Sequence, residues 1–174
     1  FRDLVLYNLE AGQAVLTDNN DIRIYTDGKE KFHALIEEMK RAKKYIHVQY
    51  YIIRNDEVWQ DIEKVLIEKA HEGVEVRVLF DSMGCRTMHK RDWDRLKRKG
   101  IRVAEFFPAI LGQLQMRVNY RNHRKIVVID GKVGFVGGFN VGREYIGKDE
   151  KFGYWRDTHL CIEGAAVTSL AVRF

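Results

Sequence analysis

A histidine and a lysine two residues apart are the side chains in this sequence best placed to do chemistry together. His123 and Lys125 come directly before the apolar, β-branched run Ile126–Ile129. Successive side chains of an extended strand alternate between its faces, so both groups are expected to project on the same side. An imidazole can attack phosphorus or transfer a proton, and an ammonium can neutralise phosphoryl oxygens. The pair therefore predicts chemistry on a phosphate ester.

Other residues of the same kind of site follow at fixed offsets. Asp130 completes an H-x-K-x4-D pattern, and Gly137, Gly138 and Asn140 make a G-G-x-N pattern after it. A buried strand that carries one histidine and one lysine by chance would explain the apolar run. It would not explain two polar groups on one face beside Arg121, which we name as a further residue lining the site.

The order and spacing of these residues resemble the motif of the phospholipase D superfamily. Flanking segments are similar to the bacterial cardiolipin synthase branch of that family: Tyr50–Ile53, Phe80–Gly84, Asn122–Lys125 and Tyr154–His159. The similarity runs from about Val15 to Ala166. It covers only the first motif-bearing half of such an enzyme, because a second H-x-K-x4-D pattern is absent from the sequence.

The resemblance implies roles for individual residues. His123 would form a phosphohistidine intermediate, while Lys125 and Asn140 would bind the phosphoryl oxygens. Asp157 matches the acidic position that holds the imidazole, although a salt bridge on a solvated strand is an alternative. His159, two residues further along, is compatible with lining the site or with a buried core position. For Asn140 the alternative is a helix N-cap, and the two roles are compatible.

The remaining motif residues have structural interpretations of their own. Asp130 stands in an Asp-Gly pair at an expected hairpin turn, an odd number of residues from His123, so we assign it a structural role in the turn. Gly137 and Gly138 permit close backbone approach to a ligand, and a bulge at a strand end explains them equally well.

Composition restricts the partners without selecting one. The chain has 174 residues and a net charge of +5, which favours an anionic partner such as phosphate ester, nucleic acid or lipid headgroup. Its two cysteines, Cys85 and Cys161, have no metal-ligand spacing, and no apolar run is long enough to span a membrane. We expect a single domain over residues 1–174, excised from a longer protein whose second half and membrane helices lie outside it.

Strand and helix signals alternate along the first part of the chain. Strands are expected at 22–25, 45–53, 74–80 and 101–106, with helices at 32–43, about 56–72 and 91–99 between them. Later come a hairpin at 124–136, a short helix at 141–146, a strand at 155–162 and a helix from residue 165. The pattern predicts an α/β sandwich, similar to phospholipase D, with a mixed, largely parallel sheet flanked by helices.

Two segments outside the motif bear on the substrate. The apolar loop Phe106–Met116 would suit acyl chains, although packing on the core explains it nearly as well. The basic run His89–Lys99 is either a solvated helix face or a surface that meets anionic lipid.

The resemblance implies a phosphatidyltransferase that makes cardiolipin from two phosphatidylglycerol molecules, without a cofactor or metal. The second motif would come from the missing half in cis or from a homodimer. The expected location is the bacterial cell membrane, with the catalytic domain facing the cytoplasm and with no nucleic-acid partner. The alternatives are a dimeric phosphodiesterase or nuclease of the same superfamily and a non-catalytic, anion-binding half-domain.

Metal independence is a testable expectation, since the sequence has no carboxylate or cysteine cluster with metal-ligand spacing. Turnover by the full-length protein, measured as product formed from labelled phosphatidylglycerol, should persist after treatment with a chelator. Complete loss on chelation, with rescue by a stoichiometric divalent ion, would contradict this expectation.

Overall fold

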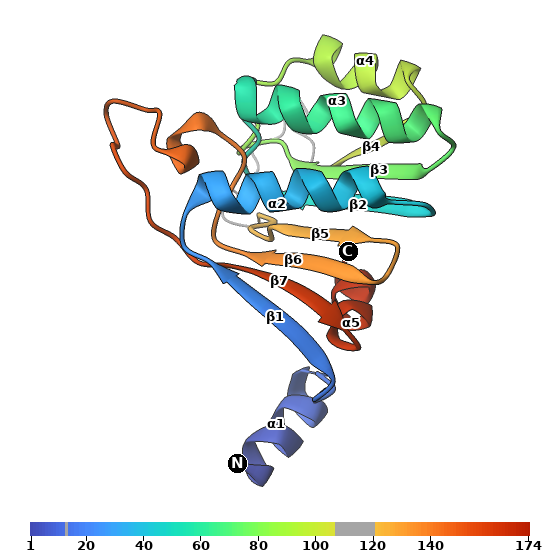
Figure 1. The fold of residues 1–174 in the computed structure, drawn as a ribbon, viewed down its shortest axis with the longest axis vertical. Coiled ribbons are helices and arrows are strands. Elements are labelled where there is room, and N and C mark those ends of the chain that lie inside the picture. Colours follow the sequence, from blue (N-terminus) through green and yellow to red (C-terminus); the bar gives the residue numbers. More distant parts are fainter. Residues whose placement is uncertain (13, 107–120) are drawn as a thin grey trace, which may run out of the picture.

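The computed structural model describes residues 1–12, 14–106 and 121–174, which form one sheet with helices on both faces (Figure 1). The helices are α1 (Arg2–Gly12), α2 (Gly28–Arg41), α3 (Glu57–His71), α4 (Lys90–Arg98), the 3-10 helix η1 (Arg143–Ile146) and α5 (Ala166–Arg173). The strands are β1 (Asn20–Tyr25), β2 (Tyr45–Tyr50), β3 (Glu75–Asp81), β4 (Arg102–Phe106), β5 (Ile126–Ile129), β6 (Val133–Gly137) and β7 (His159–Gly164). The apolar loop predicted at 106–116 lies, after its first residue, outside the described residues.

The seven strands of the sheet lie in the order β1-β7-β6-β5-β2-β3-β4. The expected α/β sandwich and mixed sheet are confirmed, but the expectation of a largely parallel sheet is wrong. Only β2–β3 and β3–β4 are parallel, whereas β1–β7, β7–β6, β6–β5 and β5–β2 are antiparallel. Helical crossovers connect β2, β3 and β4 in one direction, whereas the rest of the sheet grows by a hairpin and returning strands.

Helices α2, α3 and α4 cover one face of the sheet, and α5 packs on the other face against β5, β6 and β7 (Figure 1). Helix α2 begins after Asp27, whose carboxylate accepts hydrogen bonds from the next helical amides, and it buries Phe32, Leu35 and Met39. Trp93 of α4 stacks on Phe80 of β3 with ring centroids 3.9 Å apart. The larger of the two hydrophobic cores therefore lies between α2–α4 and the sheet, and it holds the strands that these helices cover at fixed positions.

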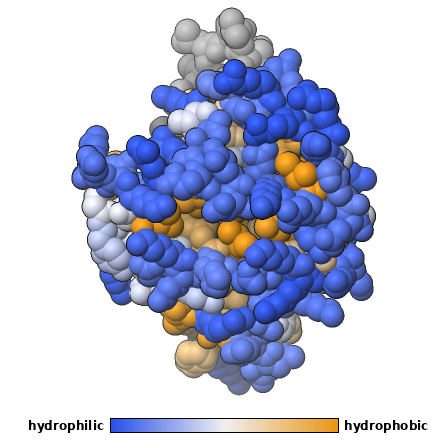
Figure 2. All heavy atoms as spheres, turned by 45° about the horizontal axis from the view of Figure 1, so that its top comes forward, coloured by the Kyte–Doolittle hydropathy of each residue, from blue (hydrophilic) through white to orange (hydrophobic). Residues whose placement is uncertain are grey.

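The surface in Figure 2 is largely hydrophilic, with apolar residues showing in several places across its middle and again toward its lower edge. Helix α1 stands away from the sheet and buries none of its residues (Figure 1). In the part of the chain that the structure describes, no helix combines the length and the apolar character needed to cross a membrane.

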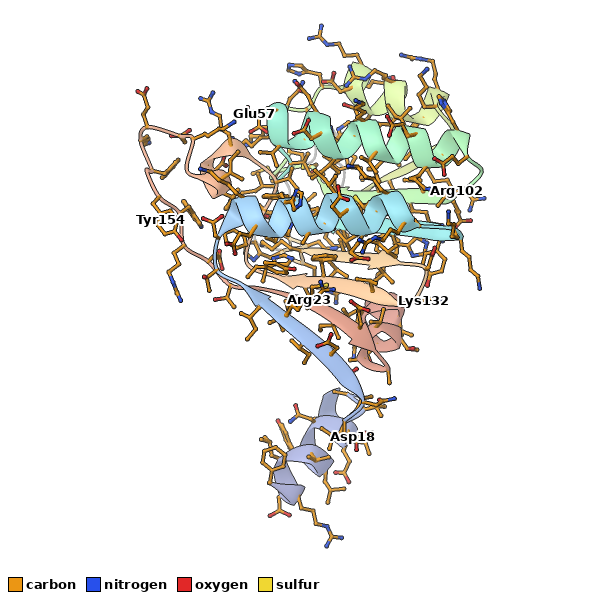
Figure 3. All side chains as sticks on the ribbon, in the orientation of Figure 1. Asp18, Arg23, Glu57, Arg102, Lys132 and Tyr154 are labelled. Carbon is orange, nitrogen blue, oxygen red and sulfur yellow. The ribbon has the colours of Figure 1, made fainter. Side chains whose placement is uncertain are left out.

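The hairpin predicted from the Asp-Gly pair is confirmed. Asp130 and Gly131 both have positive φ, at 55° and 68°, and Lys132 N donates to Ile129 O over 3.0 Å. This backbone matches the right-handed twist of the flanking strands, and aspartate and glycine are among the residues that adopt it at least cost. The turn, beside the labelled Lys132 in Figure 3, lies at the opposite end of β5 from Lys125.

The Asp130 side chain ties this turn to the connection between α2 and β2. Its carboxylate accepts hydrogen bonds from the backbone amides of Lys43, Lys44 and Tyr45 at 2.7–2.9 Å. Partial burial by itself would raise the pKa of Asp130. The three amides and the charge of Lys132 outweigh that effect and hold the pKa below its ordinary value. The geometry gives Asp130 a wider structural role than stabilising its own turn.

Replacement of Asp130 by asparagine tests that role, because asparagine also tolerates positive φ and so removes mainly the charge. We expect the free energy of unfolding to fall by about 1–3 kcal/mol near neutral pH. The folded-state pKa lies below the ordinary 3.8, so the stabilisation is present above pH 3.8 and is lost as the pH falls through the folded-state pKa. Urea unfolding followed by circular dichroism should show this difference shrinking in acid. The exposed Asp61 on α3, changed to asparagine, is the control, and an equal loss there would contradict a specific role.

Candidate active site

The segment that carries His123 and Lys125 lies just ahead of β5, which begins at Ile126. The sequence prediction of strand from Arg124 onward is therefore wrong by two residues. The segment is fixed instead by Asp81, a buried residue at the carboxyl end of β3. One oxygen of Asp81 accepts a hydrogen bond from Asn122 N over 3.1 Å, and the other accepts from Met83 N over 2.9 Å.

The lysine and the histidine of the motif are in direct contact. Lys125 Nζ lies 3.0 Å from His123 Nδ1, 3.1 Å from its Nε2 and 2.8 Å from its backbone oxygen. A neutral imidazole has one acceptor nitrogen, so only one of the two ring contacts can be a hydrogen bond at a time. The prediction that both side chains share one side is confirmed by these distances.

Burial and mutual repulsion keep this pair from carrying two charges. The pKa of His123, which remains exposed, is lowered from 6.5, first by the partial burial of its ring and then by the charge of Lys125. Burial lowers the pKa of Lys125 to about 8, although Asp157 opposes that shift. The imidazole is therefore neutral near pH 7 while the lysine is still largely cationic, which is the combination that a nucleophile beside an anionic substrate requires.

An aromatic residue flanks the pair. The ring of Tyr51, one residue past the end of β2, lies 4.7 Å from the imidazole of His123, tilted by 54°. Lys125 Nζ lies 5.6 Å from the centre of the same ring. Tyr51 thus limits where both groups can move. The electron-rich face of its ring also attracts the ammonium of Lys125, which partly offsets the loss of water around that charge.

Asp157 was predicted in a strand with His159, and this placement is wrong. Strand β7 begins only at His159, because its neighbours β1 and β6 end at Tyr25 and Gly137, the residues that pair with His159. Asp157 Oδ1 accepts a hydrogen bond from Thr158 N over 2.7 Å. The carboxylate acts on the site through the charge of Lys125, and no hydrogen bond to His123 is found among the described residues.

The paired glycines make room for this acidic segment. A Cβ built on Gly138 would lie 1.9 Å from Asp157 Oδ1, and one on Gly137 would lie 2.4 Å from Thr158 O. The amide of Gly138 also donates to Thr158 O over 2.8 Å. The backbone and the carboxylate of the Asp157 segment occupy the space that side chains at positions 137 and 138 would need. This close packing explains the two glycines without ligand approach or a strand bulge.

His159 lies beneath the site with no solvent exposure. Burial, followed by the charges of Lys31 and Lys125, lowers its pKa to about 2, so the ring is neutral. Neither ring nitrogen has a hydrogen-bond partner within the described ranges. Its flat ring faces that of Phe139 with centroids 6.1 Å apart, so His159 packs as a core residue beside two amines.

Asn140 is held by two hydrogen bonds. Its Oδ1 accepts from Ile52 N over 3.1 Å, and its Nδ2 donates to Tyr145 Oη over 3.0 Å. The alternative role as a helix N-cap is not seen, because η1 has Gly142 at that position and no side chain caps it. The amide is 5% exposed, so any ligand that it binds must reach a nearly closed position.

From the sequence, Tyr51 is compatible with lining the cleft or with a half-buried strand face, and Asp81 is expected in a turn, with which its bond to Met83 N agrees. The bond of Asp81 to Asn122 N and the contact of Tyr51 with His123 depend on tertiary structure. Sequence analysis missed Tyr145, which carries no motif signal, since aromatic residues are common in any core. Arg121, predicted to line the site, is half-buried at the start of the described segment that leads to β5.

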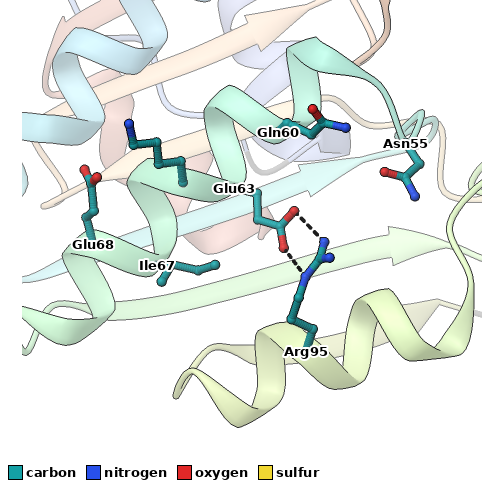
Figure 4. A pocket seen from close by; sticks show the side chains of 7 residues that line it. Asn55, Gln60, Glu63, Ile67, Glu68 and Arg95 are labelled. Atoms are coloured by element: carbon teal, nitrogen blue, oxygen red, sulfur yellow. Dashed lines mark hydrogen bonds and ion pairs between the residues drawn. The ribbon is translucent and has the colours of Figure 1, made fainter.

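Other features of the structure do not belong to this site. Within residues 1–12, 14–106 and 121–174, no three histidine, cysteine, aspartate or glutamate side chains cluster as a metal site. A shallow groove of about 500 Å³ between α3 and α4 is crossed by the ion pair of Glu63 and Arg95 (Figure 4). None of the motif residues lines that groove.

Solved structures place the fold in the phospholipase D class. NucT from Helicobacter pylori superposes with a TM-score of 0.65 at 13% identity, over 89% of this chain and 91% of that one. Nuc from Salmonella typhimurium, described as a phospholipase D family member, gives a TM-score of 0.63 at 16% identity, over 89% and 91%. Phosphatidylserine synthase from Haemophilus influenzae gives a TM-score of 0.63 at 20% identity, over 87% of this chain and 35% of that one.

The chain belongs to the family described as cardiolipin synthase, phospholipase D-like domain, whose pattern matches residues 35–157. It is 52% identical over 174 residues to cardiolipin synthase 2 of Staphylococcus epidermidis and 52% identical to a cardiolipin synthase of Staphylococcus aureus. The alignments include all of this chain but only 36% and 35% of those proteins. The chain thus spans about a third of the length of these relatives.

The lowered pKa of Lys125 predicts how anion binding depends on pH. Sulfate keeps two negative charges across the neutral and alkaline range, so a change in its affinity for the chain reports the protein. Binding, measured by calorimetry, should weaken as the pH rises through about 8, because the ammonium of Lys125 loses its proton. Arginine at position 125 should keep binding at higher pH, since its pKa exceeds about 12. Unchanged affinity in a Lys125→Met variant would exclude Lys125 from the anion site.

Proposed function

We propose that the full-length protein containing this chain is a phosphatidyltransferase that makes cardiolipin from two phosphatidylglycerol molecules and releases glycerol. The observation that carries the proposal is the 52% identity to named cardiolipin synthases over all 174 residues. The chemistry of the described site agrees with it, because a neutral imidazole stands 3.0 Å from a buried ammonium.

The proposed reaction has two displacements at one phosphorus. His123 attacks the phosphorus of the first phosphatidylglycerol, a P–N bond forms, and the bond from phosphorus to the glycerol oxygen breaks. The glycerol leaves with a proton supplied by an acid from the second motif. A hydroxyl of the second phosphatidylglycerol then gives its proton to the same group of the second motif, which is now a base, and attacks phosphorus, so that the P–N bond breaks and cardiolipin is released.

The described residues have distinct tasks in this scheme. Before substrate binds, Lys125 Nζ contacts the imidazole of His123, and phosphoryl oxygens would draw that ammonium away and free the acceptor nitrogen. Asn140 would donate to a second oxygen, and Asp157 would favour the charged form of Lys125. Asp157 is therefore proposed to act on the imidazole indirectly, through the lysine.

The proposal requires a second histidine motif that this chain lacks. A second motif-bearing half in cis or another copy of the chain would supply it, and a single domain over residues 1–174 is proposed as the first half-site. The substrate places the reaction at the bacterial cell membrane, with the catalytic domain proposed to face the cytoplasm.

The test replaces His123 with alanine in the full-length protein. Formation of labelled cardiolipin from phosphatidylglycerol vesicles, followed by mass spectrometry, should fall by about 10³-fold or more with the fold intact. The exposed histidine His33 on α2, changed to alanine, is the matched control and should keep normal turnover. Near-normal turnover in a folded His123→Ala protein would remove His123 from the mechanism. Cleavage of DNA by the parent protein without cardiolipin formation would instead favour a nuclease.

A further inference from the structure

The side chain of Asn140 has a defined orientation because each end meets a different partner. The backbone N–H of Ile52 can only donate, so the carbonyl oxygen of Asn140 must face it at 3.1 Å. The amide nitrogen then faces Tyr145 Oη at 3.0 Å. An amide nitrogen carries two hydrogens, so one is used by Tyr145 and the other is available to a ligand.

The partner hydroxyl is itself held firmly. The ring of Tyr145 is 5% exposed and meets Trp155 and Phe139 edge-on, with centroids 5.1 Å and 6.4 Å apart. The carbonyl oxygen of Tyr145 packs so closely on the first residue of α2, Gly28, that a Cβ there would lie 1.8 Å from it. The ring therefore has little freedom to move its hydroxyl away from Asn140.

The helix that carries Tyr145 is fastened to the start of α3. Arg143 N donates to Asp56 Oδ2 over 2.7 Å, and Arg54 Nε donates to Glu144 Oε1 over 3.0 Å. Asp56 also caps α3 through the amides of Val58 and Trp59. These two contacts hold η1, and with it Tyr145, against residues outside the motif.

We propose that Tyr145 is a positioning residue for Asn140, whose remaining amide N–H binds a phosphoryl oxygen of the substrate. Tyr145 touches no reacting atom and acts through the amide that it holds. The inference rests on the proposed function, and it assigns a task to η1, which lies between Asn140 and Asp157 in the chain. Trp155, the edge-on neighbour of Tyr145, lies two residues before that acid.

A double-mutant cycle in the full-length protein tests the inference. Tyr145→Phe keeps the ring and removes the hydroxyl, so kcat should fall about tenfold, equivalent to about 1.4 kcal/mol, with little change in KM. In an Asn140→Ala background the same change should cause no further loss, because the amide that it positions is gone. Additive losses in the double variant, or normal kcat in Tyr145→Phe, would overturn the inference.

Tyr50→Phe is the control for a purely structural loss. Tyr50 is fully buried and its hydroxyl accepts a hydrogen bond from Lys31 Nζ over 2.7 Å, so its loss also removes a buried contact. Its effect on kcat should add to that of Asn140→Ala. Coupling of Tyr50 to Asn140 as strong as that of Tyr145 would show a general loosening of the core and would overturn the assignment.

A binding measurement on this chain separates the inference from the proposed function. Inorganic phosphate should shift the side-chain amide signals of Asn140 in ¹H–¹⁵N spectra. This shift should be largely lost in Tyr145→Phe, because the amide is no longer held toward the anion, whereas the phosphate affinity, like KM, should change little. If the parent full-length protein forms no cardiolipin, the proposed function fails, and the phosphate titration still decides the role of Tyr145. An Asn140 signal shift of the same size in parent and variant would overturn that role.

The parent chain alone provides a test if Tyr145→Phe does not fold. The Asn140 amide proton that is donated to Tyr145 should exchange slowly with water and show nuclear Overhauser contacts to the ring protons of Tyr145. Exchange as fast as that of an exposed asparagine such as Asn19 would overturn the inference.

Discussion

An ammonium held against a neutral imidazole is the interaction on which the arrangement of this site depends. Two positive charges at 3.0 Å would repel strongly, so one of the two groups must give up its proton. Burial acts on both groups, but Asp157 favours the charged form of Lys125. The lysine therefore keeps the charge and the histidine keeps a lone pair. Three further contacts fix this arrangement. Asp81 holds the backbone at Asn122, the ring of Tyr51 packs on the imidazole, and the paired glycines leave room for Asp157.

The parts of the fold that could be predicted from sequence are those with local causes. Helical periodicity located α2, α3 and α4 to within a few residues of their ends, and the Asp-Gly pair predicted the β5–β6 turn correctly. The direction of most strand pairs could not be predicted, because pairing depends on which strands lie side by side. The start of β7 was missed for the same reason, since it is set by the ends of β1 and β6.

The candidate site shows the same division. The spacing of His123 and Lys125 places them in contact by local geometry, so sequence sufficed. The contact between Gly138 and Asp157 joins residues from separate loops. No local sequence pattern predicts that the carboxylate of Asp157 fills the space that a Cβ at position 138 would take. The partners of Asn140 could not be predicted either, because Ile52 is distant in the sequence and Tyr145 belongs to no motif. Motif residues could be predicted, whereas the residues that orient them required the fold.

The hydrogen bonds of Asp130 also bear on the order in which the chain folds. They join residues 85 to 87 positions apart, so they form only after most of the intervening chain has been drawn together. Closing so long a loop costs entropy that only assembled structure can offset. The segment with His123 and Lys125, just ahead of the other end of β5, is thus secured late. A partly folded chain would not hold these two side chains in contact, and the site forms only with the sheet as a whole.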